Sequence, residues 1–168
     1  VAMASVGAVF GTRLRPRLEM IAASSADSAE RYRSAFGFRR AAPDWQALVN
    51  DPGVEAIIIA SPQETHREIA EAAFALGKPV FCEKPLSDTM EDARALVRAA
   101  EASGLPNMVG FNYSRTPATQ FARKLIAEGA LGDITWFRCE HSEDFLSDPA
   151  TPFNWRCSGR ANGNMGDL

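Results

Sequence analysis

Four short polar segments of this sequence each follow an apolar run of the kind that forms a buried strand. They are residues 23–25, residues 61–66, the tripeptide Glu83-Lys84-Pro85 and residues 110–113. In open α/β sheets, ligands bind in the crevice outside the carboxyl ends of the strands. Hydroxyl, amide, imidazole, carboxylate and ammonium groups gathered at such a crevice can bind a polar cofactor. We therefore predict that these segments form one cofactor cleft.

The hydrophobic pattern predicts the elements that position this cleft. Short apolar runs bounded by polar or breaker residues are typical of buried parallel strands, and they alternate here with stretches of helical spacing. Strands are expected at residues 17–23, 55–60, 79–82 and 107–111, and helices at residues 27–36, 45–49, 64–76, 87–103 and 117–128. Asp44 and Ser87 are the expected N-caps, and Gly37 and Gly77 the expected helix ends. The alternation predicts an α/β fold, a doubly wound parallel sheet with helices on both faces.

The pattern changes after Asn112. Residues 134–141 alternate apolar and polar side chains, as in a strand of a sheet with one exposed face. We place a domain boundary at this change, so that residues 1–112 form the first domain and residues 113–168 begin a second, α+β domain.

The first ten residues are apolar and small, and we interpret them as the remainder of a helix. Gly7 and Gly11 do not form a glycine-rich phosphate loop, because no strand precedes them and no suitable helix follows. We therefore expect the sequence to be a piece of a longer protein.

Composition excludes several classes of function. The chain has 168 residues, 46% of them apolar, with 18 lysine and arginine residues against 21 aspartate and glutamate residues. The net charge of −3 argues against nucleic acid as a partner, because nucleic-acid-binding domains carry a basic excess. No apolar run approaches the roughly 18 residues of a membrane helix. We expect a cytoplasmic globular protein.

Neither the cysteines nor the histidines predict a metal site. Cys82, Cys139 and Cys157 are far apart and show no metal-ligand spacing, so we expect reduced thiols. His141 stands among Glu140, Glu143 and Asp144, but acidic loops are usually solvated faces, and we expect no metal there.

Longer strings within these segments resemble the Gfo/Idh/MocA family of nicotinamide-dependent oxidoreductases. The strings are Ile59-Ala60-Ser61-Pro62-Gln63-Glu64-Thr65-His66, then residues 75–86 ending in Glu83-Lys84-Pro85-Leu86, then Val109-Gly110-Phe111-Asn112-Tyr113-Ser114-Arg115 and the closing Gly166-Asp167-Leu168. The resemblance covers nearly the whole chain. The E-K-P tripeptide about twenty residues after S-P-x-x-x-H is specific as a pair, whereas either motif alone would be weak.

The resemblance implies an N-terminal Rossmann domain, here without its first strand and G-x-G-x-x-G loop, and the start of a C-terminal domain with a mainly antiparallel open sheet. Members of the family oxidise a hydroxyl of a sugar, inositol or related polyol, or run the reverse reaction, and are often homo-oligomers. The resemblance implies that Lys84 and Asp167 are catalytic, and that a catalytic histidine follows beyond Leu168. The charge of Lys84 would stabilise a developing alkoxide and orient the substrate.

The other expected site residues fall into two groups. The cofactor side comprises Ser24, Ser25, Ser61, Pro62, Gln63, His66, Glu83, Lys84, Pro85 and Asn112, and the substrate side comprises Lys84, Asn112, Trp155 and Arg156. Local alternatives stay open: the alternative for His66 is to cap or pack the helix that it begins, and the alternative for Asn112 is to be a turn residue. The alternative for Trp155-Arg156 is to anchor a packed loop, and the sequence leaves open whether the peptide bond before Pro85 is cis or trans.

The cofactor is expected to be NAD or NADP, with a slight lean to NADP. An acidic residue at the end of the second Rossmann strand would bind the ribose 2′-hydroxyl of NAD. Residues 23–25 offer two hydroxyls and no carboxylate, which permits a 2′-phosphate. Three other hypotheses remain: an NAD-dependent glycoside hydrolase of the same fold, a non-catalytic dinucleotide-binding regulator, and a fragment with no activity of its own.

Overall fold

The computed structural model describes residues 2–13, 15–142, 144 and 147–152. Its strands form two parallel ladders. β1 (Met20–Ile21) pairs with β2 (Arg40–Ala41), while β4 (Val80–Cys82) lies between β3 (Ile57–Ile59) and β5 (Asn107–Val109). These orders correspond to strands 3-2 and 4-5-6 of the Rossmann order 3-2-1-4-5-6. The expected strands between residues 17 and 111 are thus confirmed, each with shorter bounds.

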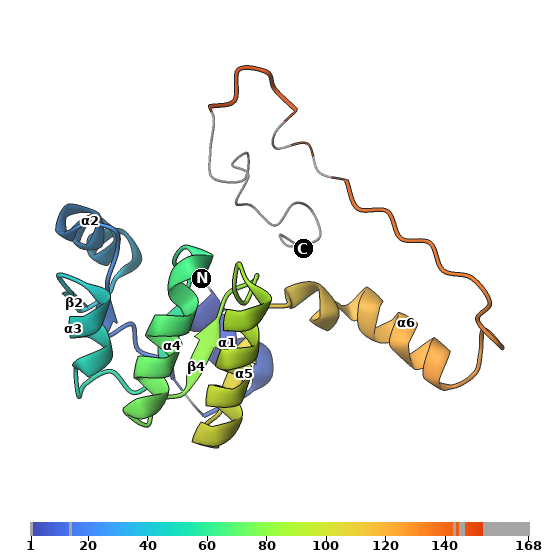
Figure 1. Cartoon of the computed structure of the whole chain (residues 1–168), viewed down its shortest axis with the longest axis horizontal. Coiled ribbons are helices and arrows are strands. Elements are labelled where there is room, and N and C mark those ends of the chain that lie inside the picture. The colour runs from blue at the N-terminus through green and yellow to red at the C-terminus, as the bar shows by residue number, and fades with distance from the viewer. Residues whose placement is uncertain (1, 14, 143, 145–146, 153–168) are drawn as a thin grey trace.

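Helices connect successive strands. The helices are α1 (Ala2–Phe10), α2 (Ala26–Phe36), α3 (Trp45–Asn50), α4 (His66–Ala75), α5 (Met90–Ser103) and α6 (Pro117–Ala127), with short 3-10 turns η1 (Gln63–Thr65) and η2 (Asn112–Arg115). Figure 1 shows α4 and α5 side by side in front of β4, with α1 behind it. Helices therefore lie on both faces of the sheet, as the sequence predicts. The helix expected over the first ten residues is confirmed from Ala2.

Local capping explains where several helices begin and end. Asp44 accepts the Ala47 amide at 2.7 Å and caps α3 as expected. Gly37 ends α2 at φ 77°, in the left-handed region that a residue without Cβ adopts most readily.

The expected cap of α5 is wrong. Thr89, not Ser87, accepts the Asp92 amide, at 3.1 Å, and its hydroxyl donates to the Asp92 carboxylate at 2.9 Å. This reciprocal pair outcompetes Ser87, whose hydroxyl instead bonds the Thr89 backbone in the turn before the helix.

The core lies between the β3-β4-β5 ladder and the helices in front of it. Ile57, Ile59, Val80 and Cys82 point to this face and pack against α4 and α5. Side chains alternate along a strand, so Ile58 points to the other face, where it is 52% exposed. This packing fixes the strands whose carboxyl ends carry the predicted cleft.

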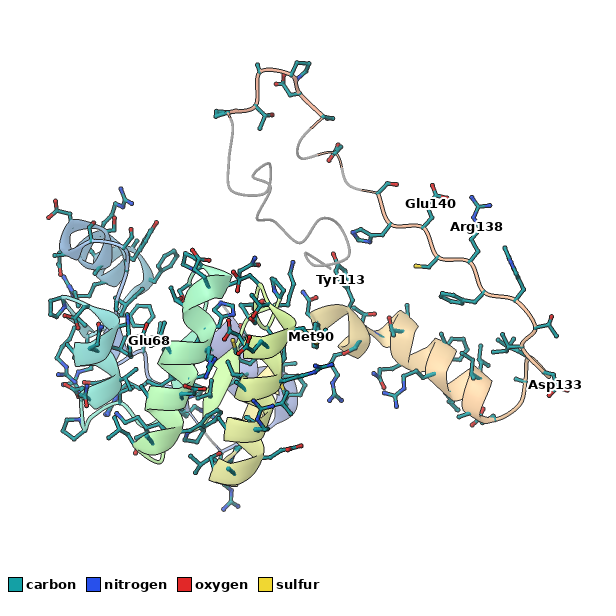
Figure 2. The ribbon with its side chains drawn as sticks, in the orientation of Figure 1. Glu68, Met90, Tyr113, Asp133, Arg138 and Glu140 are labelled. Carbon is teal, nitrogen blue, oxygen red and sulfur yellow. The ribbon has the colours of Figure 1, made fainter. Side chains whose placement is uncertain are left out.

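Residues 134–141 do not form the expected strand. They are extended and exposed, and Figure 2 shows Arg138 and Glu140 pointing away from the helices. Within the described residues no strand pairs with this segment, so its backbone groups have no ladder to join. The open sheet expected for the rest of residues 113–168 stays a prediction. No helix in the described ranges is long and apolar enough to cross a membrane.

Candidate active site

The ends of β3, β4 and β5 lie side by side, since backbone hydrogen bonds between the strands continue one residue beyond β4 and β5. The Glu83 amide donates to the Ile59 carbonyl at 2.8 Å, and the Gly110 amide donates to the Cys82 carbonyl at 2.8 Å. The polar segments that follow these strands therefore emerge together at one edge of the sheet. This confirms the predicted grouping for three of the four segments.

The turn after β3 is held by its own hydroxyl groups. Ser61 Oγ lies 2.6 Å from Thr65 Oγ1, which donates to the Pro62 carbonyl at 2.7 Å. Pro62 is exposed and Gln63 is half-buried at the start of η1. The turn thus presents Pro62 and Gln63 at the sheet edge while Ser61 and Thr65 hold its shape.

His66 is the first residue of α4, and its side chain is 1% exposed. Its Nε2 lies 2.9 Å from the Ser61 carbonyl oxygen, and its Nδ1 lies 3.3 Å from the Leu86 carbonyl oxygen. The ring therefore joins the turn after β3 to the turn after β4. Both ring nitrogens face backbone, so this geometry favours the packing alternative for His66, and its role as a direct cofactor ligand stays a prediction.

The tripeptide Glu83-Lys84-Pro85 forms the turn after β4, with all three residues half-buried. The Lys84–Pro85 peptide bond is cis, which settles the alternative left open by the sequence. The Lys84 amide donates to Glu83 Oε2 at 3.2 Å. Beneath the turn, burial raises the pKa of the Cys82 thiol to about 11.

Gly110, directly after β5, belongs to the polar segment 110–113 but is not among the predicted site residues. A Cβ at this position would lie 2.8 Å from Glu83 Oε2 and 3.0 Å from Glu83 Cδ. The Glu83 carboxylate thus occupies the space that a side chain at position 110 would need. Only the register of β4 and β5 reveals this contact, because the two residues are far apart in sequence.

Ion pairs hold the helices beneath these turns. Arg67 of α4 donates to Asp92 of α5 at 2.6 Å and to Glu71 at 2.9 Å. The hydrogen bond from Arg67 lowers the pKa of Asp92, which also receives the Thr89 hydroxyl. The N-terminal ends of α4 and α5 are thereby tied together next to the turns that follow β3 and β4.

The fourth segment belongs to the other ladder. Ser24 and Ser25 are exposed after β1, and Ser25 is the N-cap of α2. Its Oγ accepts the Ser28 amide at 3.2 Å and donates to Ser28 Oγ at 3.1 Å. The Ser25 hydroxyl therefore already has two hydrogen-bond partners. Helix α2 begins at the next residue, so the backbone amides of its first turn follow both serines.

The remaining predicted residues lie after β5. Asn112 begins η2 and is exposed. Trp155, Arg156 and Asp167 lie outside the described residues, so their predicted roles stay predictions.

No metal site is visible in the part of the chain that the structure describes, where no three His, Cys, Asp or Glu side chains are placed to hold an ion. Of the acidic stretch around His141, Glu143 lies outside that part. The His141 ring instead contacts the Tyr113 ring edge-on, with 5.7 Å between centroids.

Three comparisons place the chain among known proteins. Residues 4–111 match the model of the GFO_IDH_MocA oxidoreductase family with an NAD-binding Rossmann fold. A levoglucosan dehydrogenase from Pseudarthrobacter phenanthrenivorans is 39% identical over 155 residues, which are 91% of this chain and 40% of that protein. An inositol 2-dehydrogenase from Pseudomonas fluorescens is 40% identical over 64% of this chain and 34% of its own length.

Solved structures agree with these matches. The solved structure of a levoglucosan dehydrogenase in complex with NADH and levoglucosan has a TM-score of 0.92 and 36% identity, over 99% of this chain and 46% of that one. An NAD-binding oxidoreductase from Klebsiella pneumoniae has a TM-score of 0.83 and 40% identity, over 93% of this chain and 42% of that one. The chain thus spans less than half the length of these relatives. Its motifs, its fold and these matches agree, and the chain belongs to the Gfo/Idh/MocA oxidoreductase family with an NAD-binding Rossmann fold.

Proposed function

We propose that the whole protein carrying this chain is an NAD(P)-dependent oxidoreductase that interconverts a hydroxyl and a ketone of a sugar, inositol or related polyol. The observation that carries the proposal is the place of Glu83-Lys84-Pro85 at the end of β4, between the ends of β3 and β5. Relatives named as levoglucosan, inositol and D-apiose dehydrogenases and as a 1,5-anhydro-D-fructose reductase support the substrate class.

The residues at the sheet edge fit a nicotinamide dinucleotide. Dinucleotides bind across the carboxyl ends of parallel strands, where this chain exposes Ser24, Ser25, Pro62 and Asn112. The two serines stand before the first turn of α2, and helix N-termini favour negatively charged groups. When bound, the nicotinamide supplies the acceptor or donor of the hydride.

We assign the central chemical role to Lys84. As the substrate hydroxyl gives its proton to a base, for which the histidine expected beyond Leu168 is the candidate, negative charge grows on its oxygen. A nearby ammonium stabilises that charge more strongly in the transition state than in the ground state. Glu83 positions the Lys84 backbone by accepting its amide hydrogen. Asp167 is proposed as the second catalytic group, and Trp155 and Arg156 as substrate contacts.

We propose that the cofactor is NAD or NADP, with a slight lean to NADP. Ser24 and Ser25 offer hydroxyls, not a carboxylate, at the position proposed for the ribose, so neither of these two side chains repels a 2′-phosphate. Ser24 is the freer of the two to bind it, because the Ser25 hydroxyl caps α2. Asp27 in the first turn of the helix limits the preference.

The wider organisation is also a proposal. Residues 1–112 form the cofactor domain, and residues 113–168 begin the substrate and oligomerisation domain. α6 supports this division, since it contacts η2 and none of its residues is buried. We place the whole protein in the cytoplasm as a homo-oligomer.

The test is to incubate the purified whole protein with NAD⁺ or NADP⁺ and each of levoglucosan, myo-inositol and D-apiose, and to monitor turnover through nicotinamide absorbance. Reduction of either cofactor by a member of the panel is the expected result. Release of free sugar from a glycoside with no net change in absorbance would instead identify the hydrolase. Cofactor binding without any turnover would identify the regulator.

A further inference from the structure

The ends of β4 and β5 place Glu83 and Gly110 next to each other. Cys82 pairs with Val109 in the register, and the Gly110 amide continues the ladder to the Cys82 carbonyl at 2.8 Å. Residues 83 and 110 are therefore the next pair along two parallel strands, where paired side chains share a face of the sheet. The side chain of Glu83 fills that shared face at this edge.

The glycine at position 110 is required for space rather than for backbone conformation. Gly110 is buried, and it is not among the glycines with positive φ. The three nearest atoms to a Cβ built there all belong to the Glu83 carboxyl group: Oε2 at 2.8 Å, Cδ at 3.0 Å and Oε1 at 3.1 Å. A methyl group would thus displace the end of one flexible side chain and leave the ladder intact.

The displaced group is the one that holds the Lys84 backbone. Glu83 Oε2 accepts the Lys84 amide at 3.2 Å, which is the same oxygen that lies nearest to the missing Cβ. When the carboxylate moves, the Lys84 amide loses its acceptor, and the backbone from which the Lys84 side chain extends is released.

We propose that Gly110 is a positioning residue of the active site: by lacking a side chain it seats the Glu83 carboxylate, which in turn fixes Lys84 for the reaction. This inference rests on the proposed function of Lys84 and deepens it. Gly110 acts only through Glu83, so its effect depends on the carboxyl group being present.

A double-mutant cycle tests this dependence in the whole protein. Gly110→Ala lowers kcat roughly tenfold to a hundredfold, because small misplacements of a reacting group are costly, and leaves the Kd for NADH within about twofold. Glu83→Ala lowers kcat at least as much. Adding Gly110→Ala to Glu83→Ala changes kcat by less than about twofold, since the methyl group then meets no carboxylate.

Gly53→Ala is the matched control. A Cβ at Gly53 also meets only side-chain ends at its closest approach, Asp51 Oδ1 at 3.0 Å and Arg40 Nη2 at 3.1 Å, but near the amino end of β3. The Gly53→Ala variant is expected to leave kcat unchanged. Equal losses from Gly110→Ala with and without the Glu83 side chain, or no loss in either, would overturn the inference.

The inference and the proposed function fail separately. If the unmodified protein turns over no polyol, the proposed function fails, and the same cycle is then followed in the urea midpoint of unfolding. Gly110→Ala lowers that midpoint in the unmodified protein and not in the Glu83→Ala variant. If Gly110→Ala does not fold, folding of the double variant supports the inference, and failure of both overturns it.

Discussion

His66 Nε2 lies 2.9 Å from the carbonyl oxygen of Ser61, five residues earlier in the chain. The other ring nitrogen, Nδ1, lies 3.3 Å from the carbonyl oxygen of Leu86. One imidazole ring therefore contacts both the turn after β3 and the turn after β4. The ring is 1% exposed, and it is the buried polar side chain of the described core. The arrangement of these two turns therefore depends on a side chain that is itself buried.

Replacing His66 should destabilise the whole protein. His66→Ala removes the ring that faces the Ser61 and Leu86 carbonyls and opens a cavity in the core, so we expect a loss of about 2 kcal/mol or more in the free energy of unfolding. Urea unfolding followed by circular dichroism measures this loss. His141→Ala, on the exposed segment after α6, serves as the control and should change stability by less than about 0.5 kcal/mol. Equal small effects of the two substitutions would show that the His66 contacts carry no stability.

Asp51 and Arg40 should give the protein part of its acid sensitivity. The side-chain hydrogen bond from Arg40, at 2.6 Å, and the Gly53 amide lower the pKa of Asp51 to about 2 from an ordinary 3.8. A carboxyl whose folded-state pKa is depressed stabilises the fold above its unfolded pKa. This contribution is lost as the pH falls from about 4 towards 2.

Asp51→Asn should therefore lower the urea midpoint at pH 7 and flatten its fall between pH 4 and 2. Asp133→Asn, at an exposed position after α6, should leave that slope as it is. An unchanged acid slope in Asp51→Asn would contradict the role of the Arg40 pair.

Ser25 offers a test of cofactor choice that preserves the helix cap. Ser25→Asp retains an oxygen that can accept the Ser28 amide, because aspartate is an equally good N-cap. The new carboxylate binds a ribose 2′-hydroxyl and repels a 2′-phosphate. We expect the ratio of the NADPH Kd to the NADH Kd to rise about tenfold, measured by nicotinamide fluorescence. Ser25→Asn, an uncharged cap, is the control, and an unchanged ratio in Ser25→Asp would place the ribose elsewhere.

Interactions between residues close in sequence made most helix ends in residues 1–112 predictable. Asp44 caps α3 through a contact three residues away, and Gly37 ends α2 through its own φ angle, so each can be predicted from a few neighbouring residues. The same local rule was available for α5, since Thr89 and Asp92 have capping-box spacing. By that rule Thr89, not Ser87, is the cap.

Features that depend on distant partners were not predictable in the same way. The pattern of residues 134–141 suits a strand, but a strand also needs a neighbour, and the described residues provide none. The motif predicts that Lys84 and His66 belong to the cofactor site. It did not indicate that His66 faces two carbonyls or that Glu83 lies against Gly110, because those contacts depend on how β3, β4 and β5 are aligned.

The most direct test of the central claim is the rate of hydride transfer in the whole protein with Lys84→Ala, measured by nicotinamide absorbance beside NADH binding by fluorescence. Loss of the ammonium should lower kcat roughly a hundredfold or more, while the Kd for NADH changes only a few fold. Lys84→Arg, which keeps the charge with a different shape, is the matched control and should retain more activity than Lys84→Ala. Turnover by Lys84→Ala at the unmodified rate would contradict the assignment of Lys84 as the catalytic residue.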